Sequence, residues 1–160
     1  MTSLYLPSTP RPASYRVKSR QRTKSSTASS GRIISREFGG QYFELTLVYP
    51  PMTRAQFSPL NAFVTALGGR NGVFNVTIPD DMSGRAGEYT GNFANFSNDW
   101  KLHLLTSDAP ATVTPPARLA GGIIITSPVY MRCSLAGDVQ QVRLDKTGLV
   151  RFELDLVERL

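Results

Sequence analysis

Apolar and polar residues alternate most clearly on either side of one helical stretch in the first half of the chain. Residues 42–49 put every second side chain on an apolar face, which predicts a strand with one buried side. That face consists of Phe43, Leu45, Leu47 and Tyr49. Residues 73–78 alternate in the same way, with Phe74, Val76 and Ile78 on the apolar face. The pattern therefore predicts two half-buried strands flanking residues 53–67.

Residues 53–67 carry the signals of a short helix. Thr53 stands three residues before Gln56, which is the spacing of a capping box. Apolar residues then recur at helical spacing, and Gly68-Gly69 supplies the left-handed conformation that ends a helix. The predicted helix and turn carry Phe57, Leu60, Phe63, Leu67, Gly68 and Gly69 as their defining residues.

The second half of the chain predicts further strands joined by loops. Trp100, Leu102 and Leu104 alternate with Lys101 and His103, which indicates a strand over 100–105. Residues 129–134 alternate as well, and residues 139–144 and 149–157 are expected to pair across a four-residue turn at 145–148. In the last strand the residues expected to face the core are Val150, Phe152, Leu154 and Leu156.

These patterns predict a mainly β fold: an antiparallel β-sandwich or split barrel with one short α-helix at about 53–67. The chain has 160 residues, 13 glycines and 11 prolines, which fits one domain of many strands and tight turns. We expect an extended basic N-terminal arm and linker over residues 1–30. A single β-rich domain is expected over residues 31–160.

The net charge of +6 hides an uneven distribution. Residues 1–36 hold eight Lys/Arg and no acid, whereas residues 37–160 hold ten Lys/Arg and twelve Asp/Glu. In the arm every second residue is basic over one stretch: Arg16, Lys18, Arg20, Arg22 and Lys24. If extended, this stretch presents a row of charges about 6.6 Å apart. "SSTASS", which follows, is typical of a flexible loop or linker.

Three interpretations of the basic row remain open at the level of sequence. The row can contact an acidic rim of a neighbouring subunit, or a phosphate backbone. It can also be a solvated edge strand whose charges prevent aggregation. Binding of single-stranded nucleic acid is less favoured, because only Tyr15 lies near the row and such proteins interleave aromatic residues.

The sequence offers little for catalysis or metal binding. His103 is the single histidine, no nucleophile elbow accompanies it, and we expect a surface or rim histidine. Cys133 is expected to be a small core residue. Asp80, Asp81 and Glu88 form an acidic cluster, which we expect to be a solvated turn rather than a cation or glycosidase site. No catalytic residue, cofactor or metal site, and no membrane segment, is therefore predicted, and the chain is not expected to be an enzyme.

The chain resembles tail-tip proteins of long-tailed bacteriophages, namely the distal tail protein and the lambda-like minor tail protein M family. The resemblance covers residues 31–79 and 148–160. It rests on a glycine- and arginine-bearing lead-in, an aromatic strand, a short helix ending in two glycines, and a closing strand. The matching residues are Gly31-Arg32, Arg36, Gly39-Gly40, Tyr42-Phe43, Leu60, Ala62-Phe63, Gly68-Gly69, Phe74 and the C-terminal "LVRFELDLVERL".

The resemblance implies a virion structural protein located in the tail and assembled in the host cytoplasm. It implies a homo-oligomeric ring, usually of six subunits, that joins the tail tube protein to the hub or baseplate proteins. The helix and its glycine turn would then lie in or near the ring, and DNA could pass through the lumen. Two alternatives stay open: a head–tail adaptor that assembles on the portal, and a nucleic-acid-binding module that uses Arg16 to Lys24.

Overall fold

The computed structural model describes residues 4–79, 91–108 and 110–159, and in this part of the chain strands dominate. The expected mainly β fold, with antiparallel sheets and one helix, is confirmed, and the described strands form no closed barrel. The strands are β1 (Ser14–Arg20), β2 (Thr23–Thr27), β3 (Ile33–Glu37), β4 (Tyr42–Val48), β5 (Phe74–Ile78), β6 (Phe93–Phe96), β7 (Asp99–Asp108), β8 (Ala111–Thr114), β9 (Ile124–Ile125), β10 (Val129–Leu135), β11 (Val142–Leu144) and β12 (Val150–Glu158). The helices are α1 (Arg54–Ala66) and the short 3-10 helix η1 (Gly69–Asn71).

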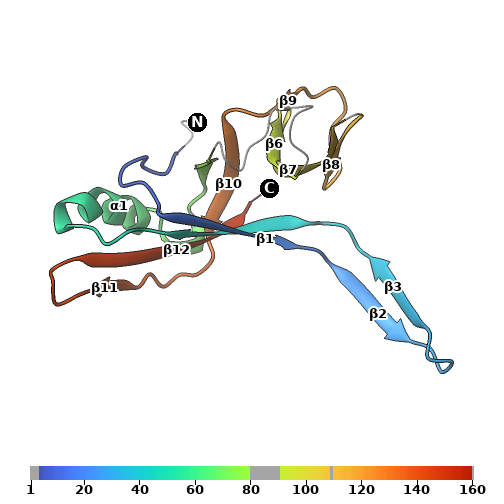
Figure 1. The fold of residues 1–160 in the computed structure, drawn as a ribbon, viewed down its shortest axis with the longest axis horizontal. Coiled ribbons are helices and arrows are strands. Elements are labelled where there is room, and N and C mark those ends of the chain that lie inside the picture. Colours follow the sequence, from blue (N-terminus) through green and yellow to red (C-terminus); the bar gives the residue numbers. More distant parts are fainter. Residues whose placement is uncertain (1–3, 80–90, 109, 160) are drawn as a thin grey trace.

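The strands form three sheets (Figure 1). The main sheet has the order β1-β4-β12-β10-β5, and β11 pairs with β12. A second sheet has the order β8-β7-β6-β9, and β2 and β3 form a separate two-stranded sheet. The expected hairpin of the last two strands is confirmed, with Arg143 opposite Arg151.

One face of the main sheet carries the core. The apolar face predicted for each of β4, β5 and β12 is buried, whereas Val48 and Val157 on the other face are half-buried. Helix α1 packs on this face through Phe57 against Phe152 and Phe63 against Phe74. The second sheet joins the same face where Phe93 meets Phe43 edge to face. The architecture is therefore two-layered, in the manner of a β-sandwich.

Helix α1 begins and ends as its sequence predicts. Thr53 is the N-cap, and both hydrogen bonds of the capping box with Gln56 are present. Pro59 lies inside the helix. Gly68 and Gly69 follow the helix with φ of 68° and 70°, a conformation that residues with a Cβ rarely adopt. These two glycines turn the chain from α1 towards β5.

The N-terminal region is extended, but it is not separate from the domain. β1 pairs with β4 along its whole length, and Tyr15 and Val17 pack against the core. The expected boundary at residue 30 falls in the turn between β2 and β3. "SSTASS" is likewise not a linker, because its first three residues belong to β2. Residues 1–30 therefore contribute an edge strand to the main sheet and one strand of a separate hairpin.

The β2–β3 hairpin projects away from the body at one end of the molecule (Figure 1). At its base, Arg20 pairs with Tyr42 in the main sheet and Thr23 pairs with Glu37 in the hairpin. Two residues, 21–22, therefore face four residues, 38–41, on the other strand. Gly39 and Gly40 both have a φ of 71° in this interruption, so the glycine pair allows the ribbon to bend.

Candidate functional site

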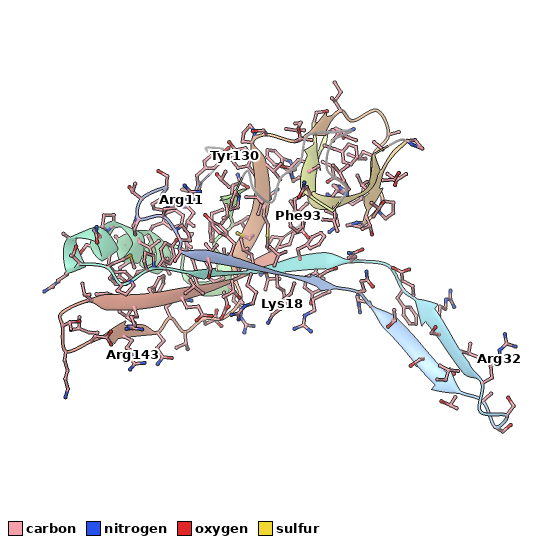
Figure 2. All side chains as sticks on the ribbon, in the orientation of Figure 1. Arg11, Lys18, Arg32, Phe93, Tyr130 and Arg143 are labelled. Atoms are coloured by element: carbon pink, nitrogen blue, oxygen red, sulfur yellow. The ribbon has the colours of Figure 1, made fainter. Side chains whose placement is uncertain are left out.

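The structure divides the predicted basic row into two parts. Arg16, Lys18 and Arg20 lie on β1 and are exposed on the face of the main sheet that points away from the core. Figure 2 shows Lys18 and Arg143 on the side of the sheet opposite Phe93. Glu44 of β4 lies opposite Lys18 and forms an ion pair with Arg20 at 3.1 Å. Lys18 and Arg20 thus have an acidic neighbour within the chain.

The remaining two charges belong to the hairpin, which we call the β2–β3 ribbon (residues 22–38). All of its side chains are exposed except that of Ala28, which is half-buried. Cross-strand register and alternation sort its residues into two faces. The basic face carries Arg22, Lys24, Ser26, Ala28, Arg32, Ile34, Arg36 and Phe38. The hydroxyl face carries Thr23, Ser25, Thr27, Ile33, Ser35 and Glu37.

The basic face concentrates positive charge without a counter-charge. Lys24 lies directly opposite Arg36, and like charges in that position destabilise a strand pair. Arg36 covers the ring of Phe38 at 5.9 Å, a cation–π contact that holds the guanidinium on this face. The single acid of the ribbon, Glu37, lies on the hydroxyl face. A face of this kind is suited to an anionic partner.

Sequence reasoning missed Arg32, Arg36 and Phe38 as members of this surface. They follow the turn, and only strand pairing brings them beside Arg22 and Lys24. A signal was nonetheless present, because Ser30-Gly31 is a turn dipeptide between two stretches of alternating residues. Gly31 has a φ of 80° in that turn.

The residues of the predicted helix and glycine turn serve the interior of the chain. The side chains of Phe57, Leu60 and Leu67 are buried, and Phe63 is half-buried against Phe74. A Cβ on Gly69 would lie 2.8 Å from the Asp138 carboxylate. These side chains hold α1 on the main sheet, so contacts with another subunit would have to come from other residues.

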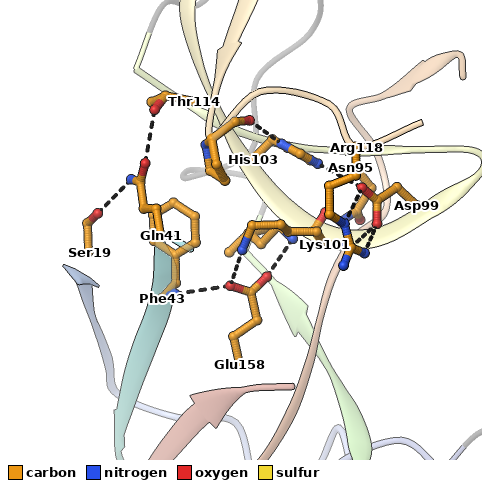
Figure 3. Close-up of polar contacts among 12 residues, drawn as sticks. Ser19, Gln41, Phe43, Asn95, Asp99, Lys101, His103, Thr114, Arg118 and Glu158 are labelled. Atoms are coloured by element: carbon orange, nitrogen blue, oxygen red, sulfur yellow. Dashed lines mark hydrogen bonds and ion pairs between the residues drawn. The ribbon is translucent and has the colours of Figure 1, made fainter. Parts of the chain in front are cut away.

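A buried polar network joins the main sheet to the second sheet (Figure 3). The Glu158 carboxylate accepts hydrogen bonds from the Phe43 amide at 3.0 Å and the Leu102 amide at 2.7 Å. Lys101 Nζ lies 3.1 Å from Glu158 Oε2, and both side chains are at most 4% exposed. One carboxylate thus satisfies three donors from β4 and β7, which fixes the second sheet on the first.

His103 belongs to the same buried region, so the expectation of a surface or rim histidine is wrong. Its side chain is fully buried, with Nδ1 2.6 Å from the Pro115 carbonyl oxygen and Nε2 3.6 Å from Asp99 Oδ2. A strand with one buried, apolar face would bury Trp100 and expose Lys101. Instead, Lys101 is also buried and Trp100 is 61% exposed. The reason is that residues after β8, including Pro115 and Arg118, cover the second face of β7.

Asp99 is held in its charged form by Arg118. The Arg118 guanidinium hydrogen-bonds both Asp99 oxygens, with Nε at 3.0 Å, and it lowers the pKa of Asp99 to about 2 despite burial. The Lys101 amide adds a hydrogen bond at 3.1 Å. The Asp99 carboxylate is therefore held by structural hydrogen bonds and does not exchange protons near neutral pH.

This arrangement predicts a loss of stability in acid. Because the pKa of folded Asp99 lies below its usual 3.8, its contribution is present above pH 4 and is lost as the pH falls towards 2. We expect Asp99→Asn to lower the free energy of unfolding by about 2 kcal/mol at pH 6, and the difference from wild type to shrink between pH 4 and 2. Urea unfolding at several pH values measures this. Asp138→Asn, which removes an exposed partner of Arg70, is the control and should change stability by less than about 1 kcal/mol at pH 6. A constant difference from pH 6 to 2 would contradict the assignment.

The described residues bring together no group of three or more His, Cys, Asp or Glu that could hold a metal ion. Cys133 is buried in the core as expected, and burial raises the pKa of its thiol far above the usual range. Asp80, Asp81 and Glu88 lie outside the described residues. Across the ranges that the structure describes, the basic face of the ribbon is therefore the most distinctive chemical feature.

Within those ranges no helix has the length and apolar character needed to cross a bilayer. Comparison with known proteins finds no matching protein family and no matching curated protein.

Proposed function

We propose that this chain is a structural protein of a bacteriophage virion that forms a ring at the distal end of the tail. In that position the ring joins the tail tube to the hub or baseplate proteins. The proposal draws on the resemblance of residues 31–79 and 148–160 to tail-tip proteins. The observation that carries it is the β2–β3 ribbon. Both faces of the ribbon are exposed, and it projects from a compact β body (Figure 1).

An isolated two-stranded hairpin is marginally stable in water, because it has no core on which to pack. The ribbon exposes Ile33, Ile34 and Phe38 by 70%, 56% and 59%. Both of its edges leave backbone groups unpaired within the described chain. A partner that covers the ribbon would remove apolar surface from water, so the ribbon is suited to intermolecular contact rather than to the fold of its own subunit.

A receiving surface lies at the other end of the same molecule, around β11 (Figure 1). Val139, Val142 and Leu144 are 87%, 45% and 68% exposed there. A hollow of about 810 Å³ beside β11 and β12 includes Val139 and Arg143 in its lining. The ribbon and the receiving surface lie at opposite ends of the subunit, so the ribbon of one subunit can contact the receiving surface of the next, head to tail. Repetition of this contact closes into a ring when the rotation from one subunit to the next permits.

The hydroxyl face of the ribbon suits this contact better than the basic face does. It carries Ile33 together with three hydroxyl residues of β2, and its single charge is Glu37. Arg143 and Arg151 on the receiving side are both in ion pairs with Asp145. Apolar contact of Ile33 with Val142 and Leu144, rather than charge, is therefore the basis of this assignment. The contact therefore places the basic face on the free side of the ribbon.

Removal of the ribbon tests the proposal. We expect replacement of residues 23–37 by a two-residue Asn-Gly turn to convert a closed oligomer into monomers, because it removes one side of every contact. Native mass spectrometry at low and high salt measures the subunit number. Circular dichroism should show that the body remains folded, since no core residue lies in the ribbon.

A matched control retains the ribbon and removes charge elsewhere: Arg16→Gln with Lys18→Gln on β1 should leave the ring intact. A wild-type chain that is monomeric under all salt conditions would contradict the ring. That result would favour the head–tail adaptor, which assembles only on its partner. Rings that survive loss of the ribbon would show that the contact lies elsewhere.

A further inference from the structure

We infer that the basic face of the β2–β3 ribbon binds double-stranded DNA through its phosphates. Arg22, Lys24, Arg32 and Arg36 are the contacting residues. This inference does not rest on ring assembly, because it concerns the face of the ribbon opposite to the proposed subunit contact. A monomer would bind in the same way.

The geometry of the ribbon fits duplex DNA. The major groove of B-DNA admits a two-stranded β-ribbon, and this ribbon projects clear of the body so that nothing else in the described chain obstructs it (Figure 1). Figure 2 shows Arg32 near the far end of the ribbon, away from the main sheet. Arg22 lies at the base, so the charges extend along its whole length.

The charges of the ribbon have no partner elsewhere in the described chain. None of the four cations on the basic face forms an ion pair, whereas Arg20 on β1 pairs with Glu44. Of the eight acids whose side chains are described, five are already in ion pairs within the chain. A second copy therefore offers few unpaired carboxylates among these residues, which makes a phosphate backbone the better match.

Two other nucleic acids fit the ribbon less well. Single strands are held by stacking on aromatic rings, and the one ring on this face, Phe38, is already covered by Arg36. Double-stranded RNA has a deep, narrow major groove that side chains do not enter. Because the four cations are assigned to phosphates rather than to base edges, we expect binding that depends little on base sequence.

The salt dependence of binding tests the inference. Fluorescence anisotropy with a labelled DNA duplex of mixed sequence measures the affinity of the full chain at several salt concentrations. Four phosphate contacts predict a slope of log affinity against log salt of about −3.6, or roughly a 150-fold loss between about 50 and 200 mM. In the double variant Lys24→Gln, Arg36→Gln the slope should fall to about −1.8, or roughly a 12-fold loss over the same range.

The control removes the same charge from the body. Arg16→Gln with Lys18→Gln should keep the wild-type slope, because these residues lie on β1 and not on the ribbon. If the slope fell equally in the Lys24→Gln, Arg36→Gln variant and in the Arg16→Gln, Lys18→Gln variant, the inference would be overturned, since net charge alone would then explain binding. Competition by polyglutamate or by duplex RNA as strong as by DNA would overturn it too, as would a full chain that shows no salt-dependent binding. Native mass spectrometry of the same samples reports ring formation separately, so either proposal can fail alone.

Discussion

Glu158→Gln is expected to lower the free energy of unfolding by about 3–5 kcal/mol, because it leaves the buried Lys101 ammonium without a counter-charge. The substitution keeps the size of the side chain but replaces one acceptor oxygen with a donor. That donor then meets the Lys101 ammonium or the Phe43 and Leu102 amides, which are donors themselves. Urea unfolding followed by circular dichroism at one protein concentration measures the change in midpoint.

Lys101→Met provides the comparison for Glu158→Gln. It removes the cation but leaves the Glu158 carboxylate with the two backbone donors, so we expect a smaller loss of about 1–3 kcal/mol. Replacing both residues with apolar ones should not restore stability, because the Phe43 and Leu102 amides would then be buried without an acceptor. If Glu158→Gln cost no more than Lys101→Met, the carboxylate would not organise this junction.

Leu144→Glu is expected to weaken ring assembly at least tenfold, equivalent to about 1.4 kcal/mol per contact. This prediction rests on the proposed contact between the ribbon of one subunit and β11 of the next. Leu144 is 68% exposed, and among the described strands β11 pairs with β12 alone, so the substitution should not affect the fold of the subunit. Light scattering after gel filtration over a range of protein concentrations measures the assembly.

Leu119→Glu is the matched control for Leu144→Glu. Leu119 is also an exposed leucine, at 56%, but it follows β8 on the side of the second sheet. It should leave assembly unchanged. If both substitutions dissociate the oligomer equally, added negative charge rather than the β11 surface would be responsible.

The two faces of the ribbon give the proposals a common structural basis. The hydroxyl face would cover a neighbouring subunit, while the basic face stays free for the phosphates of DNA. Gly39 and Gly40 lie where the ribbon joins the body. Gly40→Ala would strain a φ of 71° at this junction, so we expect it to affect both proposed contacts.

Local signals in the sequence were sufficient for the helix and the main strands. The Thr53–Gln56 capping box fixes the start of α1, and the two glycines after Leu67 fix its end. The alternation in β4 and β12 identifies their buried faces, because one side of each strand faces the core and the other faces solvent. In such elements the pattern and the environment have the same period, so the sequence alone identified the apolar face. It did not identify the polar side chains of Thr46 and Glu158, which are also buried.

Only the tertiary structure decided the environment of β7 and the composition of the ribbon. Lys101 and His103 look like surface residues in sequence, yet both are buried. Pro115, which follows β8, contacts His103, and a distant acid, Glu158, supplies the charge that Lys101 needs. Arg32 and Arg36 join Arg22 and Lys24 only through strand pairing across the turn. The sequence by itself determined the periodic elements, since periodicity is a local property. Which distant segments cover a strand, or bring its charges together, depends on long-range packing, which no local pattern records.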